Sequence, residues 1–278
     1  MKKYYLLPLF LLFLTISFSQ KKKKNSDDVL KASDLSGLKF RSVGPAFMSG
    51  RIADIAINPE NENEWYVAVG SGGVWKTINS GTTWNPITDD QSFYSTGCIT
   101  IDPNNSSKIW LGTGENVGGR HVGIGHGIYV SENGGKNWKS MGLKSSEHIS
   151  KIIVSPNDSN VVFVASQGPL WSSGGERGLF KTNDGGKSWN NVLSVNEWTG
   201  VTDIAIDNEN PNILYAATWQ RHRNVASYMG GGPGTSIYKS IDNGNTWNEI
   251  NNGLPKSNLG KIGLAISPFD SSILYAAV

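Results

Sequence analysis

The octapeptide Thr182-Asn-Asp184-Gly-Gly186-Lys-Ser-Trp189 decides the fold, because the same pattern occurs four times in this chain. The pattern is Ser/Thr-x-Asp/Asn-x-Gly-x-x-Trp, and its other copies begin at Thr77, Ser131 and Ser240. The four tryptophans lie 54, 51 and 58 residues apart. A period of about 50 residues, filled with short apolar runs and turn residues, is typical of a propeller or a repeat array.

Each recurring position of the octapeptide has a physical role in a tight turn. The Asp or Asn side chain accepts backbone N–H groups, and the glycine adopts a positive φ that other residues resist. The tryptophan opens the next strand and packs a large apolar face against its neighbours. We therefore expect a structural role for Asn79, Gly81, Trp84, Asn133, Gly135, Trp138, Asp184, Gly186, Trp189, Asp242, Gly244 and Trp247.

The stretches between the octapeptides predict four short strands in each repeat. An alternating first strand is followed by a turn and by an aromatic-bearing second strand; the third strand ends at the octapeptide, whose tryptophan starts the fourth. No segment beyond the N-terminal leader has helical periodicity. The predicted first strands are Asp54–Ile57, Cys98–Ile101, Lys151–Val154, Asp203–Ile206 and Gly263–Ile266.

The octapeptide resembles the Asp-box (BNR) repeat of sialidases, sortilin-type receptor ectodomains and xyloglucan-degrading glycoside hydrolases. The resemblance covers residues 38–278 and is strongest to large secreted proteins described as sortilin-like or glycosyl-hydrolase-like. It implies an all-β propeller of four-stranded antiparallel blades. It specifies activity poorly, since Asp boxes lie away from the functional face in those families.

Counting repeats predicts about four and a half blades and an incomplete ring. The interval from Phe40 to Ile57 equals that from Trp84 to Ile101, so Leu38–Val43 is predicted to be a fourth strand without a box. The sequence stops inside the second strand of a fifth repeat. We therefore expect a partial chain, with the remaining blades supplied by a longer polypeptide.

The N-terminus predicts export to the periplasm, the cell surface or the medium. Two lysines precede an apolar run, Tyr4–Ile16, which is too short to span a bilayer, and a cleavage point follows Ser19. The predicted organisation is a signal peptide (1–19), a basic and polar linker (20–36) and the propeller (37–278). No transmembrane segment is expected.

Charge and cysteine content exclude two further classes of protein. The formal net charge is +2, but six lysines lie before residue 25, so residues 25–278 carry a net −4. That balance argues against nucleic-acid binding. The single cysteine, Cys98, leaves no internal disulfide and is expected to be a buried small hydrophobe.

The spacing of the repeats separates scaffold from loops. The distance from the end of the first strand to the aromatic residue of the second is nine residues in every repeat. From that aromatic residue to the box glycine the distance is 15, 25, 23 and 29 residues. The variable loops therefore join second and third strands, and in a propeller they open on the face opposite the boxes. Binding residues concentrate on loops carried by a rigid scaffold, so we expect a ligand site there.

Histidines, arginines and aromatic residues occur together in these loops and in the adjoining connections. Polar residues also solvate long loops, but this clustering favours a recognition surface for polar ligands. A metal site from Glu115, His121 and His126 would need a geometry that their glycine-rich spacing does not fix, so no metal and no cofactor are expected. The predicted ligand-binding residues are Arg120, His121, His126, His148, Arg177, Trp198, Arg221, His222, Arg223 and Tyr228.

Four carboxylates, Asp54, Asp203, Glu115 and Glu176, are candidates for catalysis. Glycoside hydrolysis needs two carboxylates, one acting as acid and one as base or nucleophile. For Asp54 and Asp203 a structural hydrogen-bonding role is favoured, because buried carboxylates need such partners. In the xyloglucan-degrading enzymes that the chain resembles, a catalytic aspartate precedes an Ile-Gly-Gly segment; Gly70 occupies that position here.

Three functional hypotheses remain. The leading one is an exported propeller that binds a protein, peptide or glycan through its long loops. Resemblance to sortilin-type propellers implies protein or peptide ligands, whereas resemblance to sialidases and xyloglucan-degrading enzymes implies glycans. The alternatives are a glycoside hydrolase that uses the carboxylates above, and a nonfunctional fragment of a larger propeller.

Overall fold

The computed structural model of the chain describes residues 34, 36–37 and 51–278. The predicted signal peptide, most of the linker and the predicted strand Leu38–Val43 lie outside the described residues. Within 51–278 the secondary structure consists of strands, turns and loops, without an α-helix. No described residues form a helix of the length and apolarity needed to span a membrane.

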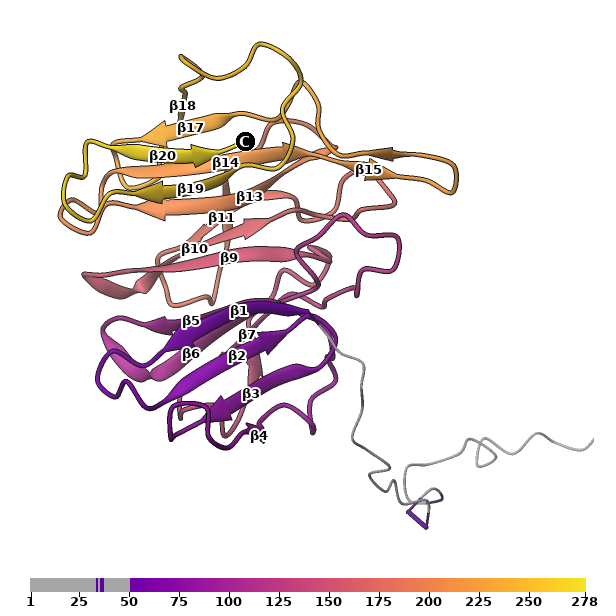
Figure 1. Cartoon of the computed structure of the whole chain (residues 1–278), viewed down its shortest axis with the longest axis vertical. Coiled ribbons are helices and arrows are strands. Elements are labelled where there is room, and N and C mark those ends of the chain that lie inside the picture. Colours follow the sequence, from indigo (N-terminus) through magenta and orange to yellow (C-terminus); the bar gives the residue numbers. More distant parts are fainter. Residues whose placement is uncertain (1–33, 35, 38–50) are drawn as a thin grey trace, which may run out of the picture. The chain divides into compact units, whose positions relative to one another are not determined.

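Four antiparallel four-stranded sheets form the first four blades (Figure 1). Blade 1 contains β1 (Ile52–Ile57), β2 (Trp65–Val69), β3 (Gly73–Thr77) and β4 (Asn85–Pro86). Blade 2 contains β5 (Thr96–Asp102), β6 (Asn105–Thr113), β7 (Ile128–Ser131) and β8 (Lys139–Ser140). Blade 3 contains β9 (Ile149–Ser155), β10 (Asp158–Ser166), β11 (Gly178–Thr182) and β12 (Asn190–Leu193).

Blade 4 and the strands after it complete the described chain. Blade 4 contains β13 (Thr199–Ile206), β14 (Leu214–Gln220), β17 (Ile237–Ser240) and β18 (Asn248–Glu249). A two-stranded hairpin, β15 (His222–Arg223) and β16 (Tyr228–Met229), is inserted between its second and third strands. Strands β19 (Gly263–Ile266) and β20 (Leu274–Ala277) form a two-stranded fifth sheet. The structure is thus an all-β propeller whose ring is not closed.

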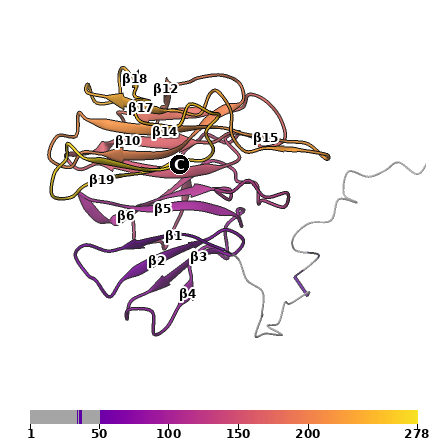
Figure 2. The same ribbon diagram turned by 45° about the horizontal axis from the view of Figure 1, so that its top comes forward.

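The blades stack in chain order, and their first strands are neighbours (Figure 2). β1 contacts β5, β5 contacts β9, β9 contacts β13, and β13 contacts β19. Apolar clusters fill the spaces between successive sheets; one of them joins Tyr66 and Ala68 of blade 1 to Ile99 and Leu111 of blade 2. Burial of apolar side chains between sheets is the main stabilising contribution in such a repeat architecture.

The octapeptide forms the predicted turn in all four blades. In each, the Ser or Thr hydroxyl accepts the glycine N–H, as Thr182 Oγ1 does from Gly186 N at 2.9 Å. The Asp or Asn carboxyl or amide oxygen accepts the N–H four residues later, as Asp184 Oδ1 does from Ser188 N at 2.9 Å. Serine and threonine hydroxyls next to Asp184 and Asp242 lower the pKa of both carboxyls.

The position of the box tryptophans differs slightly from the sequence prediction, whereas the burial of Cys98 agrees with it. The box tryptophans come one residue before the fourth strand and do not open it: the box turn ends at the residue before the tryptophan, and strand pairing begins at the residue after it. Cys98 is a free, buried thiol in β5, as expected, and burial raises its pKa well above its usual range.

Candidate functional site

Three long loops on the face opposite the boxes lie against one another. They connect the second and third strands of blades 2, 3 and 4, and we call them the rim loops: residues 114–127, 167–177 and 221–236 (Figure 1). Arg120 Nη2 donates to Val225 O at 3.2 Å, and Arg223 Nη2 donates to Gly118 O at 3.0 Å. The loops of blades 2 and 4 are therefore joined in both directions.

A glycine permits a close approach between these two loops. A Cβ atom added at Gly118 would overlap the hydroxyl of Tyr228, which leaves no room for a larger residue. The guanidinium of Arg223 lies 4.4 Å from the centre of the Tyr228 ring, a cation–π contact on the other loop. The rim is thus held by close packing as well as by hydrogen bonds.

Two of the predicted ligand-binding arginines are buried beneath the rim loops. Arg221 is fully buried; its Nη1 donates to Val117 O at 2.9 Å and its Nη2 to Gly168 O at 3.2 Å. Burial, with the nearby Arg177 charge, lowers the pKa of Arg221 to about 9. Because backbone carbonyls of two other blades occupy this guanidinium, it acts as an internal brace among blades 2, 3 and 4.

Arg177 braces the loop of blade 3 in the same way. Its guanidinium donates to several carbonyls, among them Gln167 O at 2.6 Å and Trp198 O at 3.3 Å. Burial lowers its pKa to about 10, while Glu147 and Glu197 act in the opposite sense. Neither arginine has a carboxylate within ion-pair distance in residues 51–278, so the negative charges of Glu147 and Glu197 act on them only from farther away.

His148, like the two arginines, is buried. Its Nδ1 lies 2.9 Å from Glu115 O, and its Nε2 is buried without a hydrogen-bond partner. Burial, followed by the charge of Arg221, lowers the pKa of His148 to about 3. The imidazole is therefore neutral near pH 7, with its Nδ1–H donated to the carbonyl of Glu115, and the imidazolium form that could serve as a general acid is not populated there.

The remaining predicted binding residues reach the surface. Arg120, His121 and His126 are exposed on the loop of blade 2. Tyr228 is 40% exposed on β16. Trp198 and His222 are half-buried and lie against each other, with ring centres 4.2 Å apart. These side chains form a mixed aromatic and basic surface over the buried arginines.

Two residues at this face were missed by the sequence analysis. Trp171, in the loop of blade 3, is 42% exposed; its signal was an aromatic residue inside a long loop. Lys261, which precedes β19, donates from Nζ to Asn116 O at 2.9 Å and to Asn116 Oδ1 at 2.7 Å. No local sequence pattern indicates the contact between Lys261 and Asn116, because these residues are 145 positions apart.

The four candidate carboxylates are separately engaged by the protein. Asp54 Oδ2 accepts the N–H of Ile99 at 3.1 Å, and Asp203 Oδ2 accepts the N–H of Leu264 at 2.8 Å. Each aspartate thus holds the first strand of the following blade. The structure does not join the two to each other by any hydrogen bond.

The two glutamates hold loops. Glu115 is 3% exposed; it pairs with Arg51 Nη2 at 2.6 Å and accepts the N–H of Gly123 at 2.9 Å. A Cβ atom added at Gly70 would lie 2.5 Å from Glu115 Oε1, so this carboxylate fills the space beside Gly70. Glu176 Oε2 accepts the N–H of Ser145 at 2.8 Å.

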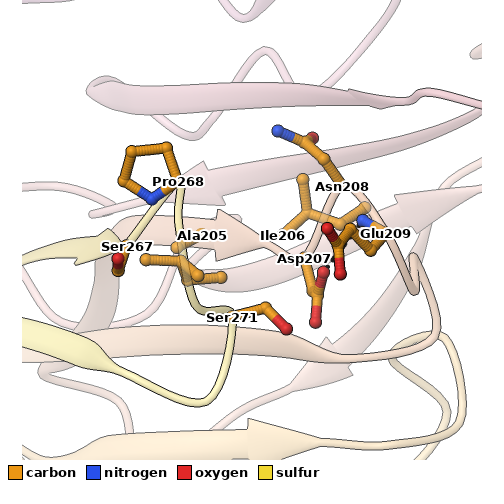
Figure 3. Close-up of a pocket in the computed structure, with 9 residues that line it drawn as sticks. Ala205, Ile206, Asp207, Asn208, Glu209, Ser267, Pro268 and Ser271 are labelled. Atoms are coloured by element: carbon orange, nitrogen blue, oxygen red, sulfur yellow. Dashed lines mark hydrogen bonds between the residues drawn. The ribbon is translucent and has the colours of Figure 1, made fainter.

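No metal-binding cluster is formed by the residues that the structure describes. Among them, no group of three or more His, Cys, Asp or Glu side chains is placed to hold an ion. A hollow of about 610 Å³ meets the rim loop of blade 3 at Glu176, and its other walls come from residues 139–143, Phe180 and residues 186–189. One cavity of about 320 Å³ lies between short turns of blade 4 and the fifth sheet, on the box side, and is lined by Asp207, Glu209 and Ser271 (Figure 3).

Comparison with known proteins agrees with this architecture. A family model, Sortilin-Vps10 (sortilin, neurotensin receptor 3), matches residues 126–261. A xyloglucanase of Hypocrea jecorina is 24% identical over 236 residues, covering 73% of this chain and 26% of the relative. A xyloglucanase of Paenibacillus is 23% identical over 255 residues, covering 82% of this chain and 24% of the relative. The chain thus spans about a quarter of the length of these curated relatives.

Solved structures show the same fold. A GH74 xyloglucanase from Xanthomonas campestris superposes with a TM-score of 0.57 at 16% identity, covering 79% of this chain and 34% of that one. An ancestral GH74 enzyme gives a TM-score of 0.59 at 18% identity, covering 80% and 28%.

The repeats, the blades and these matches define an Asp-box β-propeller protein. The chain is similar to sortilin-like and glycosyl-hydrolase-like propellers of this kind.

Proposed function

We propose that this chain is the glycan-binding part of an exported glycoside hydrolase that acts on a xyloglucan-like polysaccharide. The observation that carries the proposal is the convergence of the three rim loops into one surface with exposed aromatic and basic side chains. The curated relatives named xyloglucanases support the choice of a glycan over a protein ligand. The rim loops are the proposed contact surface.

The chemistry of the rim suits a sugar chain. An aromatic ring presents an apolar face with a negative quadrupole, against which the C–H face of a pyranose packs well. Trp171, Tyr228 and the Trp198–His222 pair offer such faces. The exposed Arg120 and His121 offer donors for sugar hydroxyls. Arg221, Arg177 and His148 contribute by keeping the loops in place.

Binding, and not bond cleavage, is the role that we assign to this stretch of the protein. A hydrolase needs one carboxyl that donates a proton and a second that acts as base or nucleophile across the scissile bond. Each of the four candidate carboxylates instead accepts hydrogen bonds from a neighbouring strand or loop.

The proposal can be tested by titrating xyloglucan oligosaccharides into the chain in a calorimeter. Trp171→Ala and Tyr228→Ala should each weaken binding by roughly twofold to tenfold, because each removes an exposed aromatic face of the kind worth about 0.5–1.5 kcal/mol. Phe269→Ala is the matched control, since Phe269 is 97% exposed but lies in the turn between β19 and β20, on the box side. Equal losses from all three, or no glycan binding, would contradict the proposal.

Hydrolysis by the chain itself is the second candidate, favoured by the activity named for the relatives. A reducing-sugar assay on xyloglucan distinguishes it. If the chain turns over substrate, Asp203→Asn or Glu176→Gln should abolish turnover while leaving oligosaccharide affinity unchanged. A chain that binds peptides from a library but no glycan would favour the sortilin-like alternative.

A further inference from the structure

Glu147 lies in a strained turn beside the rim loop of blade 2. It belongs to the connection between β8 and β9 and has φ of +56°. The N–H of His148 donates to Ser146 O at 2.6 Å, so a hydrogen bond closes the turn around Glu147 alone. A positive φ combined with this bond is the mark of the γ-turn that is rare because its central residue is strained.

Among the described residues, the other non-glycine positions with a positive φ have a structural reason for it. Ser80 and Asn243 are the fourth residues of their boxes, a position that is glycine with a positive φ in the other two boxes. Leu143 is 5% exposed and belongs to an apolar cluster between sheets. Glu147 lies outside the boxes, and its side chain is 29% exposed. Neither the box turn nor apolar packing therefore accounts for its conformation.

Two glycines of the blade 2 rim loop hold this turn in place. Gly125 N donates to Glu147 O at 2.8 Å. A Cβ atom added at Gly114 would overlap the same carbonyl oxygen, so only glycine leaves room for it. Both contacts are made by the backbone of Glu147. The position of the turn therefore does not depend on the carboxylate that it carries.

In the part of the chain that the structure describes, no protein donor forms a hydrogen bond with the Glu147 carboxylate. Its Oε2 lies 4.0 Å from Nε2 of His148, which is buried and also has no partner. Because this imidazole is neutral and its Nδ1 is bonded to Glu115 O, Nε2 is an acceptor and cannot donate to the carboxylate. The four candidate carboxylates, in contrast, all accept a protein N–H. Glu147 thus keeps its acceptor capacity for a ligand.

The charges around Glu147 select the kind of ligand group that fits. Burial lowers the pKa of Arg177 and of Arg221, and the negative charge of Glu147 acts against this shift in both. A cationic ligand group would be repelled by the two arginines, and an anionic group would be repelled by the carboxylate. A neutral O–H donor meets neither repulsion, and its hydrogen bond to a charged acceptor is stronger than one between neutral groups.

We propose that Glu147 is the carboxylate through which the rim binds a hydroxyl group of a neutral sugar. The strained turn presents the side chain, and the carboxylate accepts the O–H of the ligand. His148 is a positioning residue, because its neutral ring offers no N–H on that side and leaves the carboxylate free. This assignment rests on the proposed glycan-binding function, since it places one specific contact within that surface.

Calorimetric titration of xyloglucan oligosaccharides into the full chain tests this contact. Glu147→Gln keeps the size of the side chain but removes its charge, and it should weaken binding about tenfold. The matched control is Glu197→Gln, in the connection between β12 and β13. Glu197 is exposed and its charge also acts on Arg177, but its backbone lacks the positive φ. The control variant should bind the oligosaccharides with the affinity of the parent chain.

A second variant separates ligand contact from a structural role. Glu147→Gly should leave the midpoint of urea unfolding unchanged or raise it, because glycine adopts a positive φ without strain. The same variant should weaken oligosaccharide binding at least about tenfold, because no carboxylate remains. A residue that served only to hold the turn would show the opposite pattern, with a lower midpoint and an unchanged affinity.

Three further results would overturn this role of Glu147. Equal weakening by Glu147→Gln and Glu197→Gln would indicate a general effect of charge and not a contact. Tighter binding of protonated glucosamine oligosaccharides than of neutral ones would make the ligand group an ammonium. Unchanged affinity in Glu147→Gln, with weaker binding in Trp171→Ala, would leave the glycan-binding function standing without this contact. Absence of oligosaccharide binding by the parent chain would refute the proposed function together with the contact.

Discussion

The demand of the box for glycine can be tested within one turn, at Gly185 and Gly186. Gly186 has φ of +87° and a Cβ atom there would lie 2.9 Å from Trp110 and 3.0 Å from Met141. Gly185 has φ of +69°, and its Cβ would meet only Asn160 Oδ1, at 3.3 Å. The two neighbours thus share a left-handed backbone but differ in the space around them.

Gly186→Ala should destabilise the chain by about 2–5 kcal/mol. The left-handed conformation costs a non-glycine residue about 1–2 kcal/mol, and overpacking against the Trp110 ring adds about 1–3 kcal/mol. Gly185→Asn should cost less than about 1 kcal/mol, because asparagine tolerates this conformation. Asn243 occupies the equivalent position of the blade 4 box with φ of +58°.

The assay is urea unfolding followed by tryptophan fluorescence, with the midpoint compared among the parent chain and the two variants. A clearly lower midpoint for Gly186→Ala than for Gly185→Asn is expected. Equal midpoints would show that Trp110 and Met141 move away from the added methyl group at no cost in stability. The reasoning on contacts between blades would then be wrong.

Three further predictions concern the site and its frame. The pKa of His148 is lowered to about 3 from an unfolded value of about 6.5, so between these pH values the unfolded state binds one more proton than the folded state. The free energy of unfolding should therefore be at its full value above about pH 6.5 and fall on acidification by up to about 1.4 kcal/mol per pH unit. Urea titrations at several pH values should show a smaller slope for His148→Gln. Gly118→Ala should weaken oligosaccharide binding by displacing Tyr228, whereas Gly119→Ala should not, as calorimetry would show. Asp203→Ala should speed amide exchange in β19, and Asp203→Asn, which keeps an oxygen acceptor, should not.

The sequence by itself determined the repeat and its parts. The boxes, the constant nine-residue interval and the aromatic second strands predicted the blades, and the variable intervals predicted which loops are long. This succeeded because strand alternation, turn chemistry and glycine conformation are local properties. The prediction that Leu38–Val43 forms a strand remains untested, since it lies outside the described residues.

Only the tertiary structure decided which polar residues of the rim face solvent. Arg177, Arg221 and His148 are the same residue types as Arg120 and His121 and occur in the same kind of loop or connection. The first three are nevertheless buried and the other two exposed. Burial of a charged side chain depends on carbonyl groups that other blades bring to it, as Val117 and Gly168 do for Arg221, and such partners cannot be read from neighbouring residues. The structural role of Asp203 also depends on a distant partner, because its carboxylate accepts the N–H of Leu264 in the next sheet.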